Sequence, residues 1–99
     1  MKKFLYLYFG GNPPESEEAG KAVMADWMAY FQKMGDKIVD GGAPLGTNKW
    51  VGGKDVANPT GYSIVNAENL DAAVALTKGH PHLKARGTIQ VCETLPIPM

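Results

Sequence analysis

A helix, a glycine stop and a short strand follow one another between Trp27 and Gly46, and this succession restricts the fold more than any other feature. Apolar side chains recur at helical spacing up to Met34, and Gly35 is the type of residue that usually follows a helix C-terminus. Residues 37–40 then predict a short apolar strand that ends in Asp-Gly-Gly. This strand would deliver the carboxylate of Asp40 to a glycine-rich turn.

Three more strands and a second helix are predicted around this unit. Aromatic and β-branched runs bounded by turn residues predict strands at residues 3–9, 61–66 and 87–95. Ser16 is placed to cap the first helix, and Asn69 to cap a second helix over residues 70–78. The order βαββαβ is the ferredoxin-like pattern of the α+β class. Right-handed crossovers then give a four-stranded antiparallel sheet of order 4-1-3-2 with both helices on one face.

The chain of 99 residues predicts one domain over residues 1–99 and a sheet with one uncovered face. Apolar side chains on that face would be costly in water, at about 25 cal/mol per Å². A homodimer that packs sheet against sheet would remove this cost, and we expect one.

Composition excludes several classes of partner. Ten basic and ten acidic residues give a net charge of zero, which argues against a nucleic-acid surface. No apolar run approaches the roughly 20 residues of a membrane span. A single cysteine, Cys92, lies in an apolar strand pattern and predicts a buried, inert thiol and a cytoplasmic location.

Topology brings several predicted loops to one rim of the sheet, where Asp40 and His80 are candidate catalytic residues. A carboxylate beside an imidazole orients the ring and raises its pKa, which is the minimal pair for proton transfer. His82 is an alternative partner, and the long loop over residues 41–58 would act as a lid. The other interpretation is structural, since Asp-Gly-Gly is common turn chemistry and a histidine after a helix favours the helix dipole.

A second hypothesis is a non-catalytic pocket for a small molecule. Its candidate ligand-binding residues are Tyr6, Trp27, Met28, Trp50 and His82. We expect no metal, since two histidines separated by one proline fall short of the usual three-ligand site. We also expect no cofactor, because the glycine pairs lack the spacing of a phosphate-binding loop. A third hypothesis, a purely structural or adaptor protein, predicts no sizeable pocket.

Four segments carry a resemblance to a known family: KFLYLYFGG, AYFQKMGDKIVDGGAPLG, GYSIVNAENLDAAVALTKGHPHL and GTIQVCETLPIP. They cover nearly the whole chain in order, and the chain resembles the YCII-related family, which includes the DGPF-domain proteins. The resemblance implies a dimeric α/β barrel of ferredoxin-like protomers and a small cytoplasmic protein. The wider superfamily includes lactone isomerases, dehalogenating lyases and small oxygenases.

Two positions depart from the pattern of enzyme-like family members. Those members carry a histidine in the first helix, about three positions before the tyrosine of the AYF segment, and this chain has Trp27 there. The DGPF tetrapeptide is replaced by Asp-Gly-Gly-Ala-Pro at residues 40–44. We therefore expect a small-molecule-binding protein of the YCII type. The alternative is a cofactor-independent isomerase or lyase that acts on a cyclic or carboxylated metabolite through Asp40 with His80 or His82.

Overall fold

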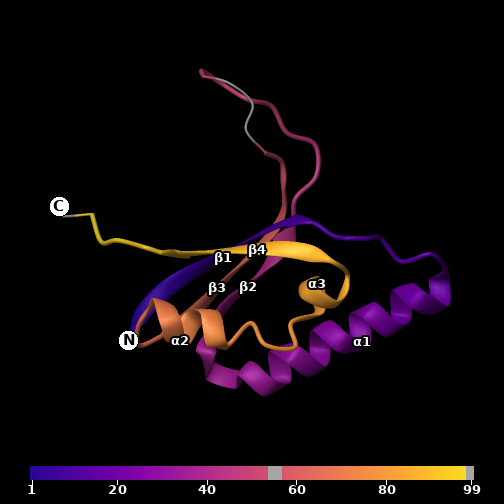
Figure 1. The fold of residues 1–99 in the computed structure, drawn as a ribbon, viewed down its shortest axis with the longest axis horizontal. Coiled ribbons are helices and arrows are strands. Elements are labelled where there is room, and N and C mark those ends of the chain that lie inside the picture. The colour runs from indigo at the N-terminus through magenta and orange to yellow at the C-terminus, as the bar shows by residue number, and fades with distance from the viewer. Residues whose placement is uncertain (54–56, 98–99) are drawn as a thin grey trace.

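A computed structural model describes residues 1–53 and 57–97 and places the elements in the predicted order (Figure 1). The elements are β1 (Lys2–Gly10), α1 (Glu17–Met34), the short 3₁₀ turn η1 (Gly35–Lys37), β2 (Ile38–Pro44), β3 (Pro59–Ala67), α2 (Leu70–Ala75), α3 (Pro81–Lys84) and β4 (Gly87–Glu93). In this described part, none of the helices is long and apolar enough to cross a membrane.

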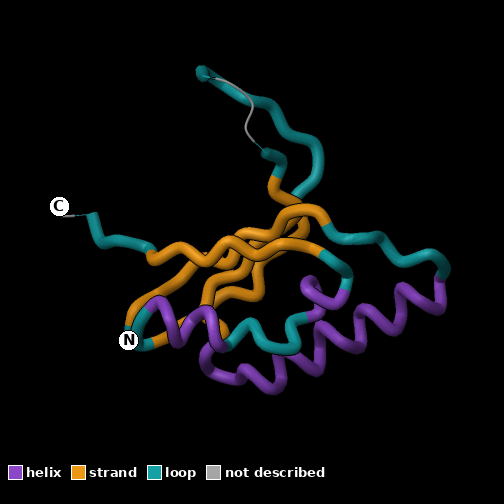
Figure 2. The backbone as a smooth tube through the Cα atoms, viewed as in Figure 1, coloured by secondary structure: helices purple, strands orange, loops and turns teal. Residues whose placement is uncertain are grey.

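The four strands form one antiparallel sheet in the order β2-β3-β1-β4, which confirms the predicted ferredoxin-like topology. Strand β1 lies inside the sheet and pairs along its length with β3 on one side and β4 on the other. All helices lie on the same side of the sheet (Figure 2). The domain is therefore two layers, with the core between the helices and one face of the sheet.

Alternation along β1 separates the two faces of the sheet. Phe4, Tyr6 and Tyr8 are buried against the helices, whereas the side chains between them are only partly covered. Tyr6 and Tyr8 share one face, as the period of two requires, and it is the face that the helices cover. The opposite face, which we call the open face, carries a group of apolar side chains at Leu5, Leu7, Phe9, Tyr62, Ile64 and Cys92. Polar residues, among them Thr88 and Gln90, lie beside this group.

Helix α1 begins and ends where its capping residues predict. The Ser16 hydroxyl accepts a hydrogen bond from the Ala19 amide at 3.1 Å, and Gly35 ends the helix with a φ of 56°. Tyr30 and Met34 are buried on the face toward the sheet, and Trp27 and Phe31 pack beside them. The predicted apolar stripe is thus the packing face of this helix.

The structure differs from the prediction in three places after α1. Strand β2 continues to Pro44 because its register shifts between Asp40 and Ala43, so that a bulge lets pairing with β3 resume. The second helix ends at Ala75 and the chain continues in turns. Residues 81–84 form the short helix α3 rather than a simple bend, because His80 caps it and Pro81 occupies its first position.

The connection between β2 and β3 leaves the sheet as a long arm, described at residues 45–53 and 57–58, on the side away from the helices (Figure 1). Trp50 is partly exposed on this arm, and Val51 is 96 % exposed. Cys92 was predicted to be buried, but it is only partly covered because it lies on the open face opposite Leu5.

Candidate functional site

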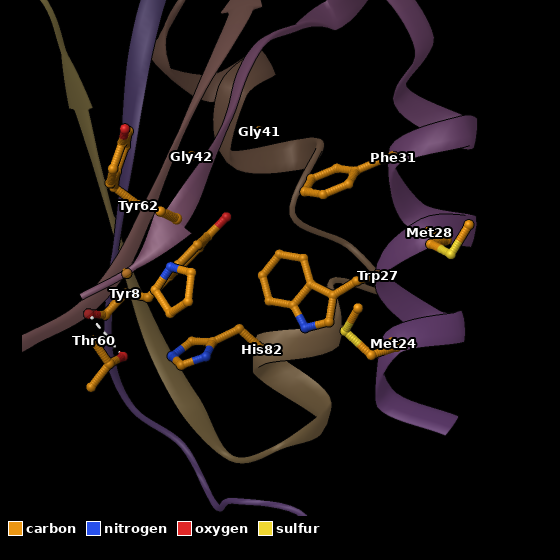
Figure 3. Close-up of a pocket in the computed structure, with 13 residues that line it drawn as sticks. Tyr8, Met24, Trp27, Met28, Phe31, Gly41, Gly42, Thr60, Tyr62 and His82 are labelled. Atoms are coloured by element: carbon orange, nitrogen blue, oxygen red, sulfur yellow. Dashed lines mark hydrogen bonds between the residues drawn. The ribbon is translucent and has the colours of Figure 1, made fainter. Parts of the chain in front are cut away.

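A cavity of about 360 Å³ lies between α1 and the β2 end of the sheet (Figure 3). Its lining comes from the middle of α1, the bulge of β2, the first residues of β3, one residue of β1 and one of α3. The lining residues are Tyr8, Met24, Trp27, Met28, Phe31, Gly41, Gly42, Ala43, Pro44, Thr60, Gly61, Tyr62 and His82. This is the rim at which the topology was expected to gather candidate residues.

Helix α1 supplies the apolar wall of the cavity. Met24, Trp27, Met28 and Phe31 lie on one side of the helix because they are three or four residues apart. The ring centroids of Trp27 and Phe31 are 5.6 Å apart, and the indole also meets Tyr8 edge-on at 5.6 Å. Met24 and Met28 are 64 % and 61 % exposed, so they form the outer edge of this wall.

The bulge of β2 supplies the facing wall, and two glycines allow its close approach. Gly42 has a φ of 77°, and a Cβ there would lie 1.7 Å from the carbonyl oxygen of Tyr62. A Cβ on Gly41 would instead point at the Phe31 ring, at 3.7 Å. The glycines therefore let the backbone of β2 bend into the cavity wall.

A hydrogen-bonded chain fixes the floor of the cavity. The His82 amide donates to His80 Nδ1 at 3.0 Å, so the neutral imidazole carries its proton on Nε2. That N–H donates to the Tyr8 hydroxyl at 3.0 Å, and Tyr8 donates in turn to Ser63 Oγ at 2.8 Å. The Ser63 hydroxyl donates the last hydrogen bond of this chain to the Gly41 carbonyl at 2.9 Å. The chain links β1, β2, β3 and α3 into one rigid unit.

Burial decides the protonation states of His80 and Tyr8 in this hydrogen-bonded chain. His80 is 0 % exposed, and its pKa is lowered to about 4, first by desolvation and then by the neighbouring His82. Desolvation also raises the pKa of Tyr8 to about 12, against the hydrogen bond to Ser63, which lowers it. Both groups are therefore neutral at pH 7. With both nitrogen atoms hydrogen bonded, His80 is suited to position Tyr8 rather than to exchange protons with a ligand.

Asp40 and His80 do not form the predicted pair. Asp40 is exposed, and its Oδ1 accepts a hydrogen bond from the Gly42 amide at 2.8 Å. The nitrogen atoms of His80 are bonded to Tyr8 and to the His82 backbone instead. The physical reason is the bulge of β2, because the Asp40 carboxylate is hydrogen bonded within that turn. His80 is buried on the helix side of β1.

His82 reaches the cavity from α3 and lies in a gap left by two glycines. Its Nε2–H donates to the Phe9 carbonyl at 2.9 Å, and its ring centroid is 5.0 Å from that of Tyr8. A Cβ at Gly87 would lie 2.1 Å from Nε2, and one at Gly11 would lie 3.0 Å from Cε1. The absence of side chains at these two positions is what admits the imidazole.

The other predicted ligand-binding residues divide into two groups. Trp27 and Met28 line the cavity as expected. Tyr6 is instead fully buried in the core, where its hydroxyl donates to the Ala73 carbonyl. Trp50 lies on the arm, in a separate shallow hollow with Asn48, Lys49 and Asn58. Of the described residues in the predicted lid, only Gly41 to Pro44 line the main cavity, so the arm does not cover it within this chain.

Besides residues 41–44, five lining side chains were not among the predicted site residues: Tyr8, Met24, Phe31, Thr60 and Tyr62. The sequence carried a signal for the first three. Tyr8 follows Tyr6 by two residues and lies one step closer to the rim. Met24 and Phe31 are three residues before and four after Trp27, on the same side of α1. Within the described residues, no three His, Cys, Asp or Glu side chains are grouped so that they could hold a metal ion.

Comparison with models of known families shows which family the chain belongs to. The model of the YCII-related domain matches residues 4–98. The chain belongs to the YCII-related family. Among curated proteins, none matches this YCII-related chain significantly.

A solved structure shares the fold of the YCII-related chain. It is 5-chloro-2-hydroxyhydroquinone dehydrochlorinase from Burkholderia phenoliruptrix AC1100, in complex with 2,5-dihydroxybenzoquinone. The two chains are 22 % identical with a TM-score of 0.50, over 87 % of this chain and 90 % of the other. At this identity the likeness supports the fold.

Proposed function

We propose that this YCII-related protein binds a small, flat and largely apolar ring compound in the cavity between α1 and the β2 bulge. The observation that carries the proposal is the pair of opposed walls, with Trp27 and Phe31 on one side and the glycine backbone of β2 on the other. Ligand pockets of this kind have volumes of about 300–1,000 Å³ and mostly apolar linings. The dehydrochlorinase of the same fold, which holds a ring compound, is consistent with this proposal.

Fluorescence of Trp27 tests the proposal directly. Replacing Trp50 on the arm with phenylalanine leaves Trp27 as the only tryptophan of the chain. A small aromatic compound that enters the cavity should then quench or shift the emission in a saturable way. Emission that stays unchanged across a panel of apolar ring compounds up to millimolar concentration would contradict binding in this cavity.

A charge at the edge of the cavity should weaken that binding. Met28→Glu places a carboxylate at an exposed lining position, and we expect an apolar ring to bind at least tenfold more weakly because the charge stays hydrated. Gln32→Glu is the matched control, since it adds the same charge one turn along α1 at an exposed position outside the lining. Titration of the Trp27 emission measures both variants, and equal losses would assign the effect to net charge alone.

We also propose that the protein is a cytoplasmic homodimer that buries the open face. The support is a contiguous row of apolar side chains on the face without helices, including Leu7 on the central strand. Leu7→Lys should therefore convert the dimer to monomers, as measured by sedimentation equilibrium. Met24→Lys, an exposed change on the helix side, should leave the dimer intact. A wild-type chain that sediments as a monomer would refute the dimer.

The proposed cytoplasmic location rests on the cysteine content. A single cysteine fits a reducing compartment.

A second candidate function is cofactor-independent acid–base catalysis, and one observation favours it. The Nδ1 atom of His82 makes no hydrogen bond to any described residue, so the ring has a site left for a substrate proton. An isomerase or lyase acting on a cyclic metabolite would use this nitrogen, whereas Asp40 serves its own turn. If this is correct, His82→Gln should lose turnover at least a hundredfold, which is more than the loss of one hydrogen bond to the substrate would explain.

A further inference from the structure

The cavity offers no charged side chain to a ligand. None of its described lining residues is Lys, Arg, Asp or Glu. Most of its polar groups are already used within the protein. The Tyr8 hydroxyl is bonded on both sides, and the Thr60 hydroxyl donates to the Tyr8 carbonyl at 3.3 Å. The Gly41 carbonyl and the Gly42 amide are paired with Ser63 and Asp40.

Three side-chain polar atoms of the lining residues have no partner among the described residues: Trp27 Nε1, His82 Nδ1 and the Tyr62 hydroxyl. Tyr62 belongs to the open face, and its ring points away from the indole and imidazole rings (Figure 3), so the two nitrogen atoms are the ones left for a ligand. Both side chains are partly exposed, and no buried side-chain nitrogen or oxygen of the described residues lacks a hydrogen bond. These two nitrogen atoms therefore remain in contact with solvent. Figure 3 shows the indole and imidazole rings entering the cavity from α1 and α3, each with a nitrogen on its lower edge.

The two atoms have opposite hydrogen-bonding characters. An indole N–H can only donate. The His82 imidazole uses its Nε2–H on the Phe9 carbonyl, so the neutral ring presents a lone pair at Nδ1 and can only accept there. The cavity thus offers one donor and one acceptor on otherwise apolar walls.

Resting on the binding function proposed above, we infer the chemical class of its ligand: an uncharged flat ring that carries a hydroxyl group and a second oxygen. The hydroxyl donates to His82 Nδ1, and the second oxygen accepts from Trp27 Nε1–H. A carboxylated ligand is disfavoured because a carboxylate would lose its water without a cation to replace it, and because it cannot donate to Nδ1. The hydroxyl requirement narrows the range of cyclic metabolites that the fold alone would allow.

Three matched ring compounds test this assignment on the intact chain. Catechol carries hydroxyl donors and oxygen acceptors, veratrole is its dimethyl ether and has acceptors only, and benzoate is an anion. We expect catechol to bind about tenfold more tightly than veratrole, which is the usual size of one net hydrogen bond, and benzoate to bind most weakly. Amide chemical shifts in two-dimensional NMR measure each dissociation constant in anaerobic buffer.

Paired substitutions of His82 separate the hydrogen bond from the shape of the site. His82→Gln can still donate to the Phe9 carbonyl but loses the acceptor, so the preference for catechol over veratrole should fall to about onefold. His82→Asn places its Oδ1 where Nδ1 lies, so it should keep most of the preference. Trp27→Phe retains an aromatic wall without the N–H, and it should weaken catechol and veratrole by the same factor, about tenfold.

The outcomes are distinguishable. Veratrole or benzoate binding as tightly as catechol to the wild-type chain would overturn the ligand class and leave ring binding intact. A preference for catechol that persists in His82→Gln would overturn the role of Nδ1 in the same way. Failure of all three compounds to shift any amide of the cavity would overturn the binding function together with this inference.

Discussion

Replacing Gly42 with alanine should lower the free energy of unfolding by about 3 kcal/mol or more, or prevent folding. The new methyl group would lie 1.7 Å from the Tyr62 carbonyl oxygen and 2.6 Å from the carbonyl carbon, both of which belong to the backbone of the paired strand. A φ of 77° adds strain for any residue with a side chain. Relief requires β2 to separate from β3, which would also remove one wall of the cavity.

Gly41→Ala is the matched control for this prediction. Its Cβ would make an ordinary contact with the Phe31 ring at 3.7 Å, and its backbone does not adopt a positive φ. We expect a change of less than about 1 kcal/mol, together with a slightly smaller cavity. Urea unfolding followed by far-UV circular dichroism compares the two variants. Similar stabilities for Gly41→Ala and Gly42→Ala would show that β2 does not approach β3 as described.

Acidification should destabilise the protein through His80. Its pKa is about 4 in the folded chain, below the ordinary value of 6.5 that the unfolded chain would have. As the pH falls through this interval, the unfolded state takes up a proton that the folded state does not, so the free energy of unfolding decreases. The loss begins near pH 6.5, reaches about 3 kcal/mol at pH 4 and is absent above pH 7.

His80→Asn isolates this effect from the titration of carboxylates. The asparagine can still accept from the His82 amide and cap α3, but it has no titrating ring and cannot reach Tyr8 as the imidazole does. We expect the variant to be less stable than the wild type at pH 7, and the difference to shrink by about 3 kcal/mol at pH 4. Urea midpoints between pH 7.5 and 4 measure this convergence. Parallel curves would mean that the folded chain protonates His80 as easily as the unfolded chain does.

Much of the architecture follows from local patterns along the chain. Ser16, Gly35 and Asn69 cap helices as predicted, and the period of two in β1 assigns Tyr6 and Tyr8 to one face. These features depend on neighbours within a few residues, so the sequence contains the information that they require. The βαββαβ order then leaves few topologies open, and the observed sheet order is the expected one.

The site was predicted less well, because its members are separated by long stretches of the chain. Trp27, Met28 and His82 do line one cavity, as the hypothesis of a small-molecule pocket predicted. Asp40 instead accepts a hydrogen bond from the Gly42 amide in the bulge of β2, and His80 is a neutral, buried residue that is hydrogen bonded to Tyr8. The position of Asp40 depends on how far β2 extends, and that of His80 depends on which side chains cover α3. Neither property can be predicted from a single stretch of sequence.

For this protein, sequence by itself determined the order of the main elements, the starts of α1 and α2, the end of α1, the alternation of the strands and the family. Each of these depends on local propensity or on a pattern shared by a whole chain. Tertiary structure alone decided that Tyr8 links His80 to Ser63, that His82 lies in the gap left by Gly11 and Gly87, and that Gly42 forms a wall of the cavity. Apart from His82 and Gly87, which are 5 positions apart, these contacts join residues that are 20 to 72 positions apart, and such approaches exist only once the helices have packed on the sheet.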